Sequence, residues 1–362
     1  MSPRKAVLIF PAGMPDALAF RDRAQALGQR VIGASSVEGD PARGQYETWE
    51  ELPYVSDPQF DGALAALMRR HDIGAVHAPH FIVWSHLSER LADIAPGATL
   101  SGAERPQDFE RAYQALRARM AADTPPIFQP AFPGKPPLSL LEKAGLIRLM
   151  NTIPGMCAEE KALAVIEVMR HAPAGDVVEI GSWWGRSAAV FAWLAGRYEV
   201  GKVLCVDPWI SEALAQGDTL VDKASAGLDT EEALRMFEIN LAPLAGGRLN
   251  YVRARSEEAA ARYRPGLVVR TEAFGETRYQ GSIAVLHIDG NHAEAQAALD
   301  ARVWTPHVAP GGWIIFDDYE WAFGDGPRKV ADAFVQRNAA SIAAMFQAGP
   351  TLFLQLRDAV DN

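Results

Sequence analysis

The chain has 362 residues, of which 49% are hydrophobic and 22% are charged, a composition typical of a folded protein with room for two domains. Its formal net charge of −10, without any run of Lys and Arg, argues against binding to nucleic acid. The apolar run near the N-terminus is too short for a signal peptide or a membrane span, so we expect no membrane association. Cys157 and Cys205 lie far apart and show no metal-ligand spacing, which favours a reducing, cytoplasmic setting.

The first third of the chain alternates short apolar strands with helices. Strands are expected at 5–10, 30–35 and 75–79, and helices at 17–27, 61–71 and about 84–94. This alternation indicates βαβ units and a parallel sheet. The segment resembles the small domain that precedes the ATP-binding domain in ATP-grasp enzymes, although no ATP-grasp domain follows. Because a fold does not fix a function, we expect domain 1–122 to serve either substrate recognition or oligomerisation, and we expect a homo-oligomer.

Three histidines gather around the end of the third predicted strand, where open α/β sheets place ligands. They are His77, His80 and His86. A surface or capping role is the more common explanation for such residues, so ligand binding here stays one of two interpretations.

A proline-rich stretch separates this domain from the rest of the chain. Residues 123–138 include Pro125, Pro126, Pro130, Pro133, Pro136 and Pro137. Proline at that density cannot sustain the hydrogen bonding of a helix or sheet, which predicts an extended linker. The second domain is therefore expected to cover residues 139–362.

The most informative stretch of the second domain is Val177–Ser187, with the sequence VVEIGSWWGRS. It predicts a strand, a glycine-bounded turn and the start of a helix, which together present backbone N–H groups and a positive dipole end to a ligand. A well-packed turn without a ligand is the alternative. The glycines stand four apart, so the dinucleotide pattern G-x-G-x-x-G does not apply.

This stretch resembles the first motif of class I S-adenosylmethionine-dependent methyltransferases. It is closest to the E-x-G-x-x-x-G-x-S variant of the macrocin O-methyltransferase and cephalosporin-biosynthesis branch, with a tryptophan where glycine is more common. The resemblance implies that S-adenosylmethionine is bound by Glu179, Gly181, Ser182, Trp183, Gly185 and Ser187. Helices expected at 139–150 and 158–171, before the first strand, would then cover the cofactor.

A second strand, 202–206, ends at Asp207. A carboxylate at that position can accept hydrogen bonds from both ribose hydroxyls, and the resemblance assigns this role to Asp207; an N-cap or turn role is the alternative. We include Trp209 among the cofactor contacts, and the resemblance places Ser256 near the adenine.

Further strands are expected at 249–253, 283–288 and 312–316, with a hairpin at 268–279 and a closing pair at 343–347 and 351–357. Residues 211–228 show no clear period and are expected to form a mobile loop. The strands and their intervening helices predict a seven-stranded, Rossmann-like α/β sheet with helices on both faces, as in class I methyltransferases.

Three carboxylates are expected at one edge of this sheet, because the fourth and fifth strands end at Asp289 and at Asp317-Asp318. Carboxylates brought together repel one another unless they are protonated or bridged by a cation. Oxygen ligands suit Mg²⁺, so we predict a Mg²⁺ site at Asp289, Asp317 and Asp318 that holds the acceptor hydroxyl. Turn formation alone is the alternative for the Asp pair.

The segments Leu286–His292 and Ile315–Tyr319 strengthen the resemblance to the macrocin branch. Catechol-type O-methyltransferases carry a lysine three residues after the first Asp, and His292 occupies that place here. Histidine, with an ordinary pKa of about 6.5, can take a proton from a hydroxyl. We therefore predict His292, with Asp289, as catalytic residues; capping of the next helix is the alternative for His292.

The expected function is an S-adenosylmethionine-dependent, Mg²⁺-assisted O-methyltransferase that acts on a hydroxyl of a small molecule, either a sugar or a natural product. One alternative is a metal-independent N- or C-methyltransferase. Another is a non-catalytic S-adenosylmethionine-binding partner of a biosynthetic enzyme.

Overall fold

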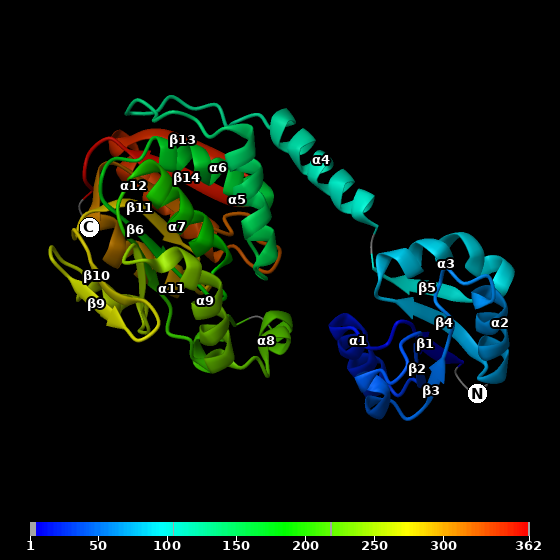
Figure 1. The fold of residues 1–362 in the computed structure, drawn as a ribbon. Coiled ribbons are helices and arrows are strands. Elements are labelled where there is room, and N and C mark those ends of the chain that lie inside the picture. Colours follow the sequence, from blue (N-terminus) through cyan, green and yellow to red (C-terminus); the bar gives the residue numbers. More distant parts are fainter. Residues whose placement is uncertain (1–4, 104, 218, 361–362) are drawn as a thin grey trace. The chain divides into compact units, whose positions relative to one another are not determined.

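A computed structural model describes residues 5–103, 105–217 and 219–360 of the chain. The chain divides into two compact units, Met1–Ala118 and Arg119–Asn362, and each unit is described by itself (Figure 1).

The N-terminal unit is a five-stranded parallel sheet in the order β3-β2-β1-β4-β5. Its elements are β1 (Ala6–Ile9), α1 (Pro15–Ala26), β2 (Val31–Ser35), a 3₁₀ turn (Pro41–Gln45), β3 (Trp49–Glu51), α2 (Phe60–Arg70), β4 (Ile73–Ala78), α3 (Phe81–Ile94), β5 (Thr99–Gly102) and α4 (Pro106–Ala122). The strands and helices expected in residues 5–94 are confirmed. The edge strands β3 and β5 were not predicted, because they are short and their residues are mostly not buried.

The three histidines of this unit have different environments. Nε2 of His86 on α3 lies 2.7 Å from Oδ1 of Asp61 on α2, so this histidine links the two helices. His77 and His80 line a hollow of about 430 Å³ beside α1 and the ends of β4 and β5. His80 also caps α3, since its Nδ1 accepts the N–H of Ile82 at 3.3 Å. The capping interpretation therefore holds for His80.

The C-terminal unit is built on a seven-stranded sheet in the order β13-β14-β12-β11-β6-β7-β8. Its strands are β6 (Asp176–Ile180), β7 (Val203–Val206), β8 (Leu249–Val252), β11 (Ile283–Ile288), β12 (Val308–Phe316), β13 (Ile342–Ala348) and β14 (Thr351–Leu356). Five are parallel, whereas β14 runs antiparallel to both β12 and β13. The predicted α/β fold and the terminal strand pair are confirmed.

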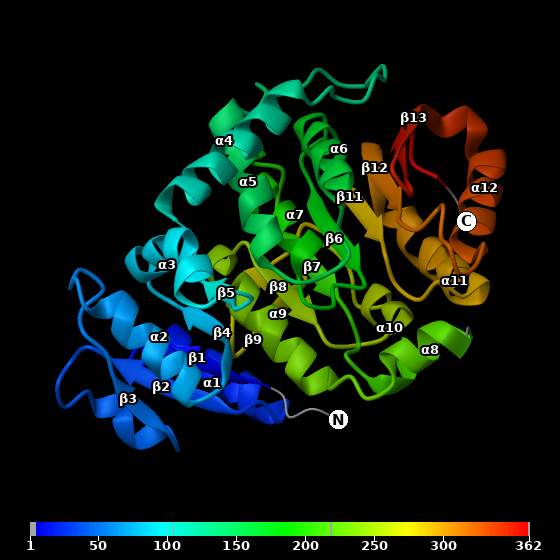
Figure 2. The same cartoon turned by 90° about the vertical axis from the view of Figure 1, so that its right-hand side faces the viewer.

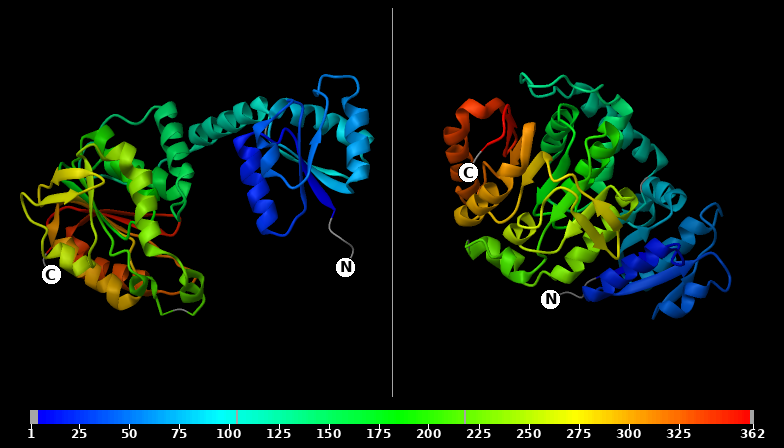
Figure 3. Two further views of the ribbon diagram at one scale, coloured as in Figure 1. Left: turned by 60° about the horizontal axis from the view of Figure 1, so that its bottom comes forward. Right: turned by 90° about the vertical axis from the view of Figure 1, so that its left-hand side faces the viewer.

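Helices cover both faces of this sheet (Figure 2). α5 (Leu140–Thr152), α6 (Glu159–Arg170), α7 (Arg186–Tyr198) and α9 (Thr230–Ala245) pack on one face, and α10 (Ser256–Ala260), α11 (Glu294–Trp304) and α12 (Gly326–Asn338) on the other. The predicted hairpin, β9 (Val268–Thr271) and β10 (Gly275–Arg278), lies beside β8 (Figure 3). Short 3₁₀ turns at Thr305–His307 and Ala339–Ser341 precede β12 and β13.

Two segments connect the regular elements of this unit. Residues 123–139 contain no helix or strand. Residues 211–228, expected as a loop, instead contain a 3₁₀ turn (Ser211–Leu214) and a short helix, α8 (Thr219–Ser225). Across the described ranges of both units, each helix is too short or too polar to cross a membrane.

The strand order reverses between β6 and β11, which are neighbours in the sheet although about a hundred residues separate them. The segments that follow β6 and β11 leave the sheet side by side at this point. The N–H of Asp289 donates to the carbonyl of Ile180 at 2.9 Å. Open α/β sheets bind ligands at such a reversal.

Candidate active site

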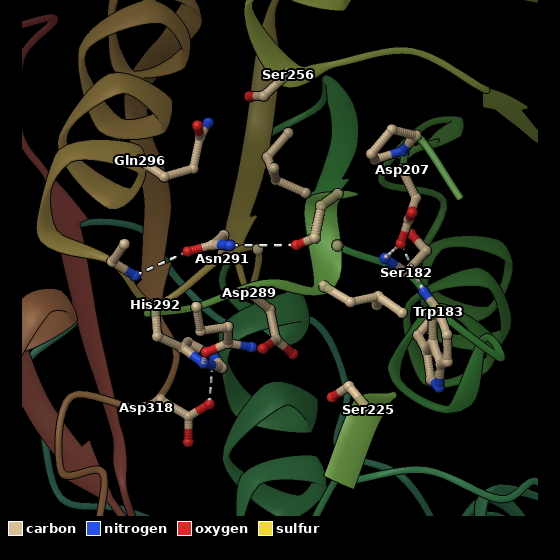
Figure 4. A pocket seen from close by; sticks show the side chains of 18 of the residues that line it. Ser182, Trp183, Asp207, Ser225, Ser256, Asp289, Asn291, His292, Gln296 and Asp318 are labelled. Carbon is tan, nitrogen blue, oxygen red and sulfur yellow. Dashed lines mark hydrogen bonds and ion pairs between the residues drawn. The ribbon is translucent and has the colours of Figure 1, made fainter. Parts of the chain in front are cut away.

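A cavity of about 1050 Å³ lies at the strand ends of the C-terminal unit (Figure 4). Its walls come from the loop after β6, the end of β7, the segment around α8, the end of β11 and the turn after β12. Pockets for single small ligands commonly measure 300–1000 Å³, so this cavity has room for a cofactor and an acceptor together.

Two glycines shape the loop after β6. Gly181 has φ +82°, and a Cβ there would overlap the carbonyl oxygen of Asp289. Gly185 has φ +88°, and its Cβ would lie 2.6 Å from Leu241 Cδ2. Gly181 therefore lets the loop pass close to the end of β11, whereas Gly185 lets α7 pack against α9.

Asp207 holds this loop in place through both carboxylate oxygens (Figure 4). Its Oδ2 accepts the N–H groups of Ser182 and Trp183, each at 3.0 Å, and its Oδ1 accepts that of Trp209 at 2.8 Å. Burial raises the pKa of Asp207 against the lowering effect of these hydrogen bonds. Asp207 also lines the cavity, and its Oδ1, which accepts a single N–H, has a second lone pair with which to accept a ligand hydroxyl.

Most of the predicted site residues line the cavity. They are Gly181, Ser182, Trp183, Ser187, Asp207, Trp209, Ser256, Asp289, His292 and Asp318. Three predicted residues do not line it, namely Glu179, Gly185 and Asp317.

Glu179 lies under the loop and is fully buried. Its Oε2 accepts the hydroxyl of Ser182 at 2.7 Å, and its Oε1 lies 3.1 Å from Nδ1 of His287. Glu179 does not line the cavity, and both of its carboxylate oxygens have partners below the cavity wall, so its contact with a cofactor stays a prediction. Its place in the motif reflects support of the loop.

The three predicted metal ligands do not form one cluster. Among the residues that the structure describes, the candidate ligand atoms form two overlapping groups that share Asp289, in each of which the atoms lie within 4.8 Å of one another. The inner triad is His287, Asp289 and Asp317, and the outer triad is Asp289, His292 and Asp318. Asp317 belongs to the inner triad and does not line the cavity, so its predicted role as a ligand of the same ion as Asp318 stays a prediction.

Asp317 is buried and already has partners of its own. Lys161 on α6 forms an ion pair with its Oδ2, and Thr351 donates to its Oδ1. The same ammonium lies 3.3 Å from Asp289 Oδ2. Burial alone would raise the pKa of Asp317. The charge of Lys161 outweighs that effect and holds the pKa of Asp317 well below its ordinary value.

The sequence carried signals for both residues that were missed. Lys161 stands four and eight positions before Val165 and Met169 of the predicted apolar helix face, so a lysine there points inward. His287 interrupts the otherwise apolar run IAVLHI of a strand buried on both faces. A polar side chain inside such an element requires a partner.

The outer triad combines an imidazole with two carboxylates inside the cavity (Figure 4). Nδ1 of His292 lies 2.6 Å from the amide oxygen of Gln216, which can accept a hydrogen bond from it. Nε2 lies 2.8 Å from Oδ2 of Asp318. Atoms this close repel each other through their lone pairs unless a proton or a metal ion lies between or beside them.

The buried charges predict a pH dependence of folding. Burial and Lys161 lower the pKa of His287, but the carboxylates of Asp317 and Glu179 outweigh them and raise it to about 9. The pKa of His287 in the folded protein is higher than the ordinary value of about 6.5. Protonation of His287 therefore stabilises the fold fully below pH 6.5, and this stabilisation is lost as the pH rises through about 9. We expect the wild type to lose about 3 kcal/mol over this range relative to His287→Gln, in urea unfolding with EDTA. A constant difference between the two proteins would contradict this expectation.

Comparison with known proteins agrees with this geometry. Residues 178–319 match the family model described as a methyltransferase domain. No curated protein matches the chain. Among solved structures, the chain is similar to the O-methyltransferase NovP (15% identity, TM-score 0.41, covering 56% of this chain and 81% of NovP).

Two further structures show a similar degree of likeness. One is CalS11, a TDP-rhamnose 3'-O-methyltransferase of calicheamicin biosynthesis (14% identity, TM-score 0.34, covering 70% of this chain and 96% of CalS11). The other is the mycinamycin-pathway methyltransferase MycE with Mg, SAH and mycinamycin VI (14% identity, TM-score 0.35, covering 59% of this chain and 54% of MycE). At these identities and TM-scores, the likenesses carry no argument about function.

The family match begins in β6 and ends just after β12, so it contains the glycine loop, Asp207 and the outer triad. The C-terminal unit thus contains a methyltransferase domain, and its seven-stranded sheet has the fold predicted for an S-adenosylmethionine-dependent methyltransferase.

Proposed function

We propose that the protein is an O-methyltransferase of the macrocin branch, which transfers a methyl group to a hydroxyl of a small molecule with the help of Mg²⁺. The observation that carries this proposal is the outer triad, in which Nε2 of His292 lies 2.8 Å from Oδ2 of Asp318 beside Asp289 in the cavity. Such a site can take a proton from an acceptor and can hold a divalent cation.

The loop side of the cavity suits S-adenosylmethionine. Gly181, Ser182 and Trp183 line this side, and Oδ1 of Asp207 has a lone pair left for a ribose hydroxyl. Ser256 lines the same cavity. The cofactor, when bound, supplies a methyl group on a good leaving group, so the protein's main tasks are alignment and deprotonation of the acceptor.

The donor set of the outer triad fits Mg²⁺, which prefers oxygen to nitrogen ligands and often takes only one or two carboxylates from a protein. We assign Asp289 and Asp318 as the residues that would hold it. The ion would lower the pKa of an acceptor hydroxyl. His292 then remains free to accept the proton of that hydroxyl at Nε2.

The acceptor side of the cavity is largely apolar and aromatic. The ring of Trp321 lies 4.4 Å from that of His292, and Trp184, Met156, Leu220 and Phe323 line the same cavity. This lining favours a natural product, or a sugar carried on one, as acceptor. The proposal has three further parts. The N-terminal unit serves substrate recognition or oligomerisation, the protein is a homo-oligomer, and it works in the cytoplasm.

Replacement of His292 by glutamine tests the assigned base. We expect methyl transfer to fall by 10²- to 10⁴-fold, the usual contribution of a general base, while S-adenosylhomocysteine binds as tightly as to the wild type. Transfer is measured with a radiolabelled methyl donor on a panel of hydroxylated glycosides and polyketides, and binding by calorimetry. His307→Gln is the matched control, because His307 lies in the same unit but does not line the cavity. Full activity of His292→Gln would reject this base.

The same assay separates the competing functions. Transfer that survives EDTA and does not respond to added Mg²⁺ supports a metal-independent N- or C-methyltransferase. Tight binding of S-adenosylhomocysteine without transfer to any acceptor supports a non-catalytic partner of another enzyme.

A further inference from the structure

The inner triad is a second candidate cation site directly behind the first. His287, Asp289 and Asp317 bring one imidazole nitrogen and two carboxylates within 4.8 Å of one another, a donor set that divalent transition metals accept when they displace the proton of the imidazole. His287 is fully buried, and among the described residues its Nε2 has no hydrogen-bond partner. This nitrogen lies 3.6 Å from Asp289 Oδ2 and 3.8 Å from Asp317 Oδ2, so it faces both carboxylates without bonding to either.

The ammonium of Lys161 lies at this inner triad. It contacts the Oδ2 atoms of both Asp289 and Asp317, the same two atoms that face His287. A lysine ammonium carries three donors and one positive charge, and its side chain here is 4% exposed. Removal of one member of a buried ion pair leaves an uncompensated charge, which costs several kcal/mol.

The backbone around Lys161 is held by the cofactor side of the unit. Arg186, the first residue of α7, donates to the carbonyls of Cys157 at 3.0 Å and Ile153 at 3.1 Å. Both carbonyls precede α6, which begins at Glu159. The segment that leads into α6 is therefore anchored, and the ammonium of Lys161 itself is held by burial and by its two carboxylate partners.

We propose that Lys161 is a built-in cation: its ammonium fills the inner triad, keeps that triad from binding a metal, and positions Asp289 so that the divalent ion binds only at the outer triad. In this proposal the two carboxylate oxygens of Asp289 have different partners. Oδ2 takes the contacts with Lys161 and His287, which leaves Oδ1 for the cavity. The statement about the outer triad rests on the proposed Mg²⁺ site, whereas the statement about the inner triad does not.

The number of bound Mn²⁺ ions tests this proposal on the full chain, without any acceptor. Titration followed by electron paramagnetic resonance should give one ion per chain for the wild type. Lys161→Met removes the ammonium and keeps the length of the side chain, so it should bind two ions. Lys161→Arg restores a cation and should bind one. Lys143→Met is the matched control, because Lys143 is also a partly buried lysine with an aspartate partner, Asp123, at 2.9 Å, and it should bind one.

Each outcome has a defined meaning. A folded Lys161→Met protein that binds one ion with unchanged affinity overturns the role of Lys161 and leaves the outer site standing. A wild type that binds none while Lys161→Met binds one removes the outer site and supports Lys161. No binding to either protein overturns both. If Lys161→Met does not fold, Lys161→Gln removes the charge but keeps a hydrogen-bond donor for the two carboxylates. It should also bind two ions, and a single ion with unchanged affinity would overturn the role of Lys161.

Discussion

Replacement of Gly181 by alanine is expected to destabilise the C-terminal unit and to abolish cofactor binding. Its φ of +82° costs an alanine about 1–2 kcal/mol. The new methyl group would also overlap the backbone carbonyl of Asp289, and such overpacking costs about 1–3 kcal/mol more. Because backbone atoms cannot rotate away, the loop and the end of β11 must separate, and the two halves of the cavity would move apart. The free energy of unfolding should fall by about 2–5 kcal/mol, measured by urea unfolding with tryptophan fluorescence.

Gly247→Ala is the control for the backbone penalty alone. Gly247 also has a positive φ, +71°, but an added Cβ there meets no atom within 4 Å. This variant should lose only about 1–2 kcal/mol and should bind S-adenosylhomocysteine like the wild type. Equal losses in the two variants would show that close approach to Asp289 is unimportant.

The order of secondary-structure elements followed from the sequence because it depends on local patterns. Apolar runs that end in Asp207, Asp289 or Asp317 identified the parallel strands, and the two glycines of the first loop marked the turn between β6 and α7. The short helix α8 did not follow, because its seven residues lack a strong apolar period.

The sequence did not reveal which acidic residues face the interior and which face the cavity, because this depends on a contact between elements far apart in the chain. Asp317 and Asp318 are adjacent, yet one faces Lys161 in the interior and the other faces His292 in the cavity. Asp318 has φ +50°, which turns the backbone after the strand, and the pattern Asp-Asp does not reveal that turn. The partner of Asp317 comes from α6, 156 residues earlier.

These contacts join the cofactor loop to the acceptor side through one buried chain of polar groups. Ser182 donates to Glu179, Glu179 faces His287, and His287 faces the two carboxylates that Lys161 holds. Every member lies in or beside the central strands β6, β11 and β12, where the backbone is least free to move. The glycine loop after β6 and the carboxylate of Asp289 thus share one buried support, which under the proposed function would hold the cofactor and the acceptor in one fixed relation.

Removal of the Asp207 carboxylate is expected to weaken cofactor binding about as strongly as the replacement of Gly181, but for a different physical reason. In Asp207→Ala the N–H groups of Ser182, Trp183 and Trp209 lose their acceptor. Each unsatisfied buried donor costs about 1–3 kcal/mol, so the loop should leave this conformation and the assigned ribose acceptor is lost as well. We expect the affinity for S-adenosylhomocysteine to fall at least 100-fold, which corresponds to about 3 kcal/mol, measured by titration calorimetry.

The matched control for Asp207 is Asp229→Ala. Asp229 also accepts two backbone N–H groups, those of Glu231 at 2.9 Å and Glu232 at 3.1 Å, but it caps α9 and does not line the cavity. Its loss should cost about 1 kcal/mol of stability and leave binding unchanged. Asp207→Asn refines the test, because its amide would direct a donor at backbone donors, so it should bind almost as weakly as the alanine variant. If Asp207→Asn instead bound the ligand normally, the carboxylate would not be what holds the loop, and the assignment of Asp207 would fail.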